Sequence, residues 1–205
     1  MAIHTWDYEP QALEVNVSEL LLATADQSDD LIDENVRQVL HDLREHLGME
    51  VIFVSEIRDG QRMFKHVDTA PGKELIATGG GSSLEESFCQ CVLDGRLPRL
   101  VQDAATHPAF TQLPATPFRV GAHLSTPIVL ANGKVYGTLC CFSQTGDESL
   151  TERDLHKLEC VAKITAKRID IKQARELQEQ LAKWELQPMD EKKPLPASFS
   201  SHIKR

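Results

Sequence analysis

The fold of this protein is decided by residues 123–143, which have the sequence HLSTPIVLANGKVYGTLCCFS. Two apolar runs flank the pair Asn132-Gly133. Asn-Gly between apolar runs is the strongest short-range signal for a β-hairpin, because both residues tolerate the positive φ that tight turns require. The stretch therefore predicts two antiparallel strands. Cys140 and Cys141 are adjacent on the second strand, so their side chains face opposite sides of the sheet.

A second hairpin is expected upstream, between residues 49–57 and 63–70, around an Asp59-Gly60 turn. The first of these runs is apolar at both even and odd positions, which indicates a central strand that is covered on both faces. A short strand is expected at 97–103. In the connection that follows, 104–120, the apolar residues have no regular spacing that would indicate a helix or a strand. Long connections of this kind inside compact domains are usually functional or mobile.

Helices are expected on both sides of these strands. Apolar residues recur at spacings of three and four from Ile32 to Leu47. A flexible break at 79–83 leads into a second helix, whose expected N-cap is Ser83. A third helix is expected from residue 152 to about residue 187. Hairpins with helices at both ends predict an α+β fold around a central antiparallel sheet of five to six strands.

Charge and cysteine content narrow the class of protein. The 205 residues include 31 acidic and 22 basic side chains, a net charge of −9, which disfavours nucleic-acid binding. No apolar run approaches the roughly 18 residues needed to span a membrane, and the first residues lack the pattern of a secretory leader. Five cysteines is an odd number, so reduced thiols in the cytoplasm are expected rather than a disulfide framework.

Four segments are expected along the chain: a flexible lead-in (1–17), one domain (18–170), an extension of the last helix (171–187) and a disordered tail (188–205). The extension carries apolar side chains at the spacing of a two-heptad coiled coil. Because an isolated helix would leave them in water, we expect a homodimer that pairs these residues. The expected interface residues are Ile171, Ala174, Leu177, Leu181 and Trp184.

Three stretches carry a resemblance to a known family. Residues 87–104 (SFCQCVLDGRLPRLVQDA) resemble the Cys-x-x-Val-Leu-x-Gly-Arg-x-Pro helix and strand of many GAF domains. Residues 127–140 resemble the hairpin of that family, which ends in Gly-Thr-Leu-Cys. Residues 150–158 resemble its closing helix. All three occur in order and at matching spacing, over about residues 20–170.

The resemblance implies a sheet with helices on one face and a loop-enclosed ligand pocket on the other, with 104–122 as the pocket wall. It also implies a small-molecule-binding sensory domain of bacterial signal transduction, acting through a separate effector protein. No cofactor is firmly implied, no metal ligands are assigned, and the identity of the small-molecule ligand stays open. Arg119 suits an anionic ligand because of its planar fork. The candidate ligand-binding residues are Phe53, Cys89, Phe110, Phe118, Arg119, His123 and Cys140.

Two alternatives stay open beside this regulatory, non-enzymatic interpretation. Some proteins of the family reduce free methionine sulfoxide with cysteines near the pocket, so Cys89 and Cys140 allow a thiol-based redox enzyme or sensor. The same cysteines can equally be small buried apolar residues. The third possibility is an interaction scaffold with an empty pocket.

Overall fold

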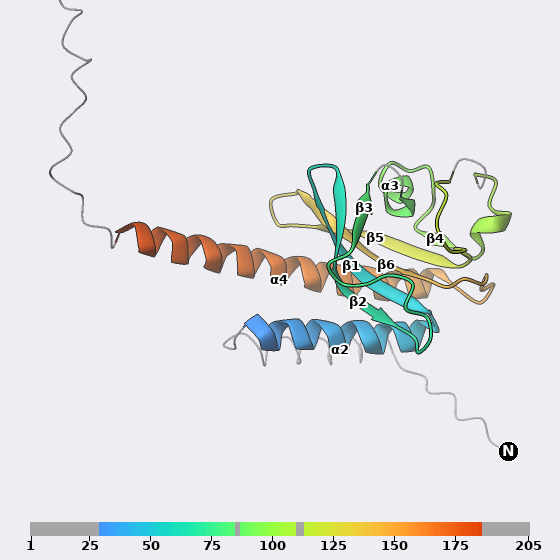
Figure 1. Ribbon diagram of the computed structural model, residues 1–205, viewed down its shortest axis with the longest axis horizontal. Coiled ribbons are helices and arrows are strands. Elements are labelled where there is room, and N and C mark those ends of the chain that lie inside the picture. The colour runs from blue at the N-terminus through green and yellow to red at the C-terminus, as the bar shows by residue number, and fades with distance from the viewer. Residues whose placement is uncertain (1–28, 85–86, 110–112, 186–205) are drawn as a thin grey trace, which may run out of the picture. The chain divides into compact units, whose positions relative to one another are not determined.

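The computed structural model describes residues 29–84, 87–109 and 113–185 of the chain. Figure 1 shows an antiparallel sheet flanked by helices. The six strands lie in the order β3-β2-β1-β6-β5-β4. The elements are α2 (Asp29–Leu47), β1 (Val51–Arg58), β2 (Gln61–Thr69), β3 (Gly81–Ser83), α3 (Phe88–Leu93), β4 (Leu100–Val101), the 3₁₀ turn η1 (Ala104–Thr106), β5 (His123–Val129), β6 (Val135–Phe142) and α4 (Glu152–Glu185). The predicted α+β fold and the six-stranded sheet are thus confirmed.

Both predicted hairpins form. In the first, Asp59 and Gly60 have φ of 52° and 71°, the positive values that a tight hairpin turn requires. In the second, only Gly133 has positive φ, at 80°. The backbone N–H of Leu130 donates to the carbonyl of Lys134, so this loop has three residues and places Gly133 at its left-handed position. The turn chemistry of the sequence therefore sets both strand pairings.

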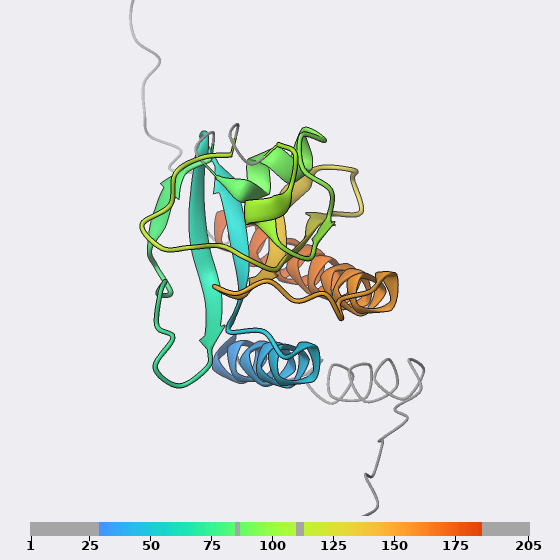
Figure 2. The same cartoon turned by 90° about the vertical axis from the view of Figure 1, so that its right-hand side faces the viewer.

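The sheet separates two apolar layers. Figure 2 shows α2 and the first part of α4 on one side of the sheet and α3 on the other. On the α2 and α4 side, Ile52 of β1 and Cys141 of β6 pack with helix residues such as Leu43 and Leu158. On the α3 side, Phe53 and its alternate neighbours pack against α3 and the connections around it. As expected, β1 is central and buried on both faces.

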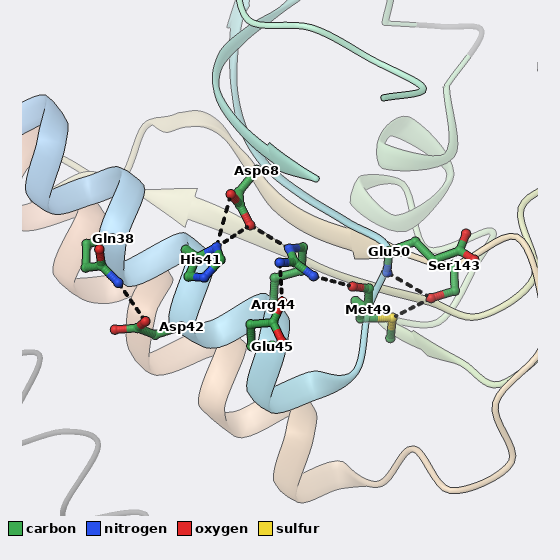
Figure 3. Close-up of polar contacts among 9 residues, drawn as sticks. All are labelled: Gln38, His41, Asp42, Arg44, Glu45, Met49, Glu50, Asp68 and Ser143. Atoms are coloured by element: carbon green, nitrogen blue, oxygen red, sulfur yellow. Dashed lines mark hydrogen bonds and ion pairs between the residues drawn. The ribbon is translucent and has the colours of Figure 1, made fainter. Parts of the chain in front are cut away.

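An ion-paired arginine joins α2 to the sheet (Figure 3). The Arg44 side chain is buried and its Nε donates to Asp68 Oδ2 of β2 at 2.5 Å. Its Nη1 donates to the carbonyl of Met49 at 3.2 Å, and its Nη2 pairs with Glu45. A buried guanidinium needs such partners because burial without them is costly. Arg44 therefore fixes the position of α2 against β2.

Three sequence expectations need correction. Residues 81–83 are not a flexible break but strand β3, which pairs with β2. A Cβ on Gly81 would lie 2.6 Å from the Arg62 carbonyl, so the glycine permits this close pairing. The N-cap of α3 is Ser87, whose Oγ accepts from Gln90 N–H, and not Ser83.

The strand expected at 97–103 is shortened to β4. The N–H of Leu97 bonds to the Cys91 carbonyl at the end of α3, and the Asp103 side chain caps η1. Both ends of the expected strand are therefore used by neighbouring turns.

The remaining expectations concern the chain ends. The lead-in 1–17 and the tail 188–205 lie outside the described residues. The described chain forms one unit up to Asp170, and the part of α4 from Ile171 to Glu185 belongs to a second. Among the described residues, no helix combines the length and apolar character that crossing a membrane requires.

Candidate functional site

Two cysteine thiols face each other on the α3 side of the sheet. Cys89 lies in the first turn of α3, which Ser87 caps, and Cys140 lies on β6. Their Sγ atoms are 3.2 Å apart. The side chains are 1% and 0% exposed, and all five cysteines of the chain are free. Cys141 faces the opposite layer, so Cys140 is the member of the Cys140-Cys141 pair that reaches α3.

Arg62 of β2 places a guanidinium against this thiol pair. Its Nη1 donates to Cys89 Sγ at 3.1 Å and its Nη2 donates to Ser82 Oγ of β3 at 2.9 Å. The guanidinium carbon lies 4.9 Å from the ring centroid of Phe64 and 5.8 Å from that of Phe53, within the range of cation–π contact. The Nε of Arg62 is buried and has no hydrogen-bond partner. The arginine is thus held in place while its buried Nε stays unpaired.

Hydroxyl groups of neighbouring strands lie next to these two thiols. Ser125 Oγ of β5 lies 3.0 Å from Cys140 Sγ, and Thr138 Oγ1 of β6 lies 3.2 Å from it. Thr138 Oγ1 in turn lies 2.8 Å from Ser55 Oγ of β1. These polar groups share the apolar face of three adjacent strands, where a buried polar atom needs a partner. We call Arg62, Cys89, Cys140, Ser125 and Thr138 the thiol cluster.

The cluster divides charge unequally between its two thiols. The hydrogen bond from Cys140 is the largest influence on Cys89, and with the positive charge of Arg62 it outweighs burial and lowers the pKa of Cys89 to about 6. Burial, with the neighbouring Cys89, raises the pKa of Cys140 well above its ordinary value. At neutral pH Cys89 is therefore the thiolate and Cys140 the protonated thiol. Burial instead raises the pKa of Cys91 and of Cys141.

His123 begins β5 beside the cluster. It is 3% exposed, and its ring meets the Phe88 ring edge-on at 5.6 Å between centroids. Burial, with the positive charge of Arg62, lowers the pKa of His123 to about 4, so the imidazole is neutral at pH 7. Its Nδ1 is buried without a hydrogen-bond partner. His123 and Arg62 thus each leave a buried nitrogen unpaired on the same face of the sheet.

The structure brings together four of the residues that the sequence singled out, namely Phe53, Cys89, His123 and Cys140. Phe118 packs against the same layer, with its ring stacked on that of Phe142 at 5.3 Å.

Arg119 is not brought to the cluster, because its side chain is 61% exposed and its Nη2 lies 3.7 Å from Asp103 Oδ2. Phe110 lies outside the described residues. Among the described residues, no group of three or more His, Cys, Asp or Glu side chains could hold a metal ion.

Sequence reasoning missed Arg62, although a signal was present. Arg62 and Phe64 are alternate residues of β2, so they share one face of the strand, and Phe64 is buried there. A lone arginine on the inward face of a strand is a candidate for charge recognition. Its partner Cys89 is 27 residues away, so no local pattern joins the two.

A family model for the GAF domain matches residues 30–170. This is more than half of the chain. The chain belongs to the GAF domain family. No curated protein matches it closely enough to be informative.

Solved structures share the fold of this GAF domain. The GAF domain of a phosphoenolpyruvate-protein phosphotransferase from Coxiella burnetii has a TM-score of 0.64 at 16% identity, over 82% of this chain and 96% of that one. The free methionine-R-sulfoxide reductase of Neisseria meningitidis, solved in complex with its substrate, has a TM-score of 0.61 at 18% identity, over 84% of this chain and 98% of that one. A phycocyanobilin-bound GAF domain from a cyanobacterial phytochrome has a TM-score of 0.58 at 11% identity, over 79% of this chain and 94% of that one. At these identities the likeness establishes the fold alone.

Proposed function

We propose that this GAF domain is a sensory and regulatory module that binds a small molecule beside its thiol cluster. One observation carries the proposal: Arg62 Nε and His123 Nδ1 are both buried without a partner. Buried polar groups in folded proteins are almost always hydrogen-bonded, and an unpaired one calls for an explanation. A ligand that pairs with both nitrogens provides one, in a protein family whose structures include ligand-bound members.

The chemistry of these groups favours a small anion with an apolar body. A guanidinium binds carboxylates and other planar oxyanions through its fork of donors. The rings of Phe53 and Phe64 flank that guanidinium and supply apolar surface. Neutral His123 offers one further donor or acceptor at Nδ1, according to its tautomer. This assignment moves the anion-binding role that the sequence suggested for Arg119 to Arg62.

Native mass spectrometry and thermal unfolding test the proposal together. The freshly purified protein is examined for a retained ligand, and unfolding is then followed with sodium acetate, benzoate, nitrate or phosphate against sodium chloride at equal ionic strength. An anion at about 100 times its Kd stabilises the fold by about 2.7 kcal/mol. We expect Arg62→Met to abolish the stabilisation and Arg119→Met to preserve it. The proposal is contradicted if the Arg62→Met variant still retains a ligand or is still stabilised by the anion. It is also contradicted if the wild type shows neither a retained ligand nor stabilisation.

We further propose that the output passes through a homodimer to a separate effector protein. Helix α4 continues to Glu185, and Ile171, Leu177 and Leu181 are 48%, 57% and 58% exposed. Large apolar side chains in water favour association, and the spacing of these residues suits a coiled coil. Ala174 is also exposed, whereas the side chain of Trp184 lies outside the described set.

Light scattering of the full chain and of a chain that ends at Asp170 tests the dimer. We expect a dimer that the truncation converts to a monomer at low micromolar concentration. A full-length monomer, or a dimer that survives truncation, would refute the role of this segment.

The alternative function is an enzyme of the kind represented by the reductase from Neisseria meningitidis. The paired thiols of Cys89 and Cys140 favour it. We nevertheless propose a regulator, because the unpaired nitrogens of Arg62 and His123 favour a bound ligand. The two functions differ in whether methionine sulfoxide is consumed, which a coupled thioredoxin assay measures.

A further inference from the structure

We infer that Cys89 and Cys140 form an oxidation site that reacts with a small hydroperoxide and closes to a disulfide. The inference goes beyond ligand binding, and it rests on the arrangement of the cluster itself. The two Sγ atoms are 3.2 Å apart, and a disulfide bond is about 2.05 Å long. An approach of about 1 Å therefore suffices to close it. Because α3 has six residues and is bounded by turns, a shift of this size is local.

The two thiols are prepared for different steps of one reaction. Cys89 has a cationic donor, Arg62 Nη1, at 3.1 Å, which stabilises its thiolate. Cys140 has no cation among its hydrogen-bond partners, and its burial together with the neighbouring Cys89 keeps it protonated, although its contacts with two hydroxyl groups act in the opposite direction. A nucleophilic thiolate with a second thiol in contact is the arrangement of a peroxide-reactive cysteine and its resolving cysteine.

The reaction balances with a hydroperoxide as the oxidant. The Cys89 thiolate attacks one peroxide oxygen, an S–O bond forms as the O–O bond breaks, and the Cys140 proton neutralises the departing oxygen as water or alcohol. The Cys140 sulfur then attacks Cys89, an S–S bond forms and the S–O bond breaks, with release of hydroxide. Two thiol sulfurs lose two electrons in total, and the peroxide gains them.

Burial restricts the oxidant to small molecules. Cys89 is 1% exposed and Cys140 is 0% exposed, while the Arg62 side chain above Cys89 is partly buried. Hydrogen peroxide is the smallest hydroperoxide, so it is the oxidant chosen to test the site.

Oxidation would also change the surroundings of Arg62. The disulfide carries no negative charge, so Arg62 loses the thiolate that its Nη1 faces and has two donors available for an anion. This consequence for binding rests on the proposed ligand function. The formation of the disulfide does not depend on it.

The experiment uses the full-length protein, reduced, desalted and treated with hydrogen peroxide before alkylation and mass analysis. We expect two fewer alkylated thiols than in the untreated reduced protein and a peptide that links Cys89 to Cys140. Cys140→Ser should stop at a sulfenic acid on Cys89 that dimedone traps, whereas the matched variant Cys160→Ser should behave as the wild type. Cys140→Ala provides the same test should the serine variant fail to fold.

The role of Arg62 is tested in the same assay. Arg62→Gln should slow disulfide formation at pH 7 by about tenfold, because less of Cys89 is then thiolate. Arg62→Lys should restore part of the rate. The control variant Arg99→Gln removes an arginine that forms an ion pair with Glu159, and it should leave the rate unchanged. A wild-type protein that stays reduced, a disulfide between other cysteines, or equal rates in Arg62→Gln and the wild type would overturn the inference. Ligand binding plays no part in these readouts, so their failure would leave the proposed function standing.

Discussion

Replacement of Cys89 by serine should remove a pH-dependent contribution to stability that the thiolate makes. The pKa of Cys89 is about 6 in the folded protein, against about 8.5 for an ordinary cysteine. A lowered pKa stabilises the fold at high pH, and that stabilisation is lost as the pH falls through the folded value. The stability of the wild type relative to Cys89→Ser should therefore rise between pH 6 and pH 8.

The size of this rise follows from the two pKa values. Between pH 6 and pH 8 the folded Cys89 goes from about half to almost fully ionised while the unfolded thiol stays mostly protonated, and one pKa unit corresponds to about 1.36 kcal/mol. The difference amounts to about 2 kcal/mol. Above about pH 8.5 the rise should level off, because Cys89 of the unfolded chain then ionises as well.

Two measurements check this prediction. Urea unfolding of both proteins at pH 6, 7 and 8 gives the free energies, and ultraviolet absorbance of the thiolate follows the ionisation directly. The groups that face Cys89 are Cys140 of β6 and Arg62 of β2, with His123 of β5 beside them. His123 has a pKa of about 4 and so does not titrate in this window. Parallel pH profiles for the two proteins, or no Cys89-dependent absorbance change below pH 7.5, would refute the reasoning.

Three further predictions concern stability and activity. Arg44→Met should cost about 3 kcal/mol of unfolding free energy in a urea titration, because it removes the buried guanidinium that pairs with Asp68 (Figure 3); an unchanged unfolding free energy would contradict this role. Gly137→Ala should cost at least about 3 kcal/mol, since the new Cβ would lie 1.8 Å from the Ser55 carbonyl oxygen; an unchanged thermal midpoint would contradict the tight β1–β6 pairing. A thioredoxin-coupled NADPH assay should show no turnover of free methionine sulfoxide, and Cys89→Ala should retain the fold; turnover abolished by that change would establish the enzymatic alternative.

Local sequence patterns determined most of the secondary structure. The spacing of three and four between Ile32 and Leu47 predicts α2, and α2 ends where Gly48 follows. The glycine-containing turns predict both hairpins. These features depend on residues close together in the chain, where turn conformation and the direction of successive side chains are decided by local geometry.

Strand β3 could not be predicted in this way. Gly81–Ser83 has no strand-forming residues, and it becomes a strand because β2 offers an unpaired edge to which it bonds. The same pairing brings Ser82 to Arg62. The N-cap at Ser87 was also missed, because Ser83 and Ser87 both suit a cap and only the pairing of 81–83 excludes the first.

The candidate site, too, was predicted only in part from the sequence. The sequence alone singled out Cys89, His123 and Cys140, and it placed Cys140 and Cys141 on opposite faces of a strand. It could not decide which of the two faces α3, because β6 is apolar on both sides and the alternation of side chains is symmetrical. Only the tertiary structure brought Arg62 to Cys89 across 27 residues, and Cys89 to Cys140 across 51. Contacts at such separations arise from the packing of α3 on the sheet, and that packing turns two small buried residues into a thiolate and its neighbouring thiol.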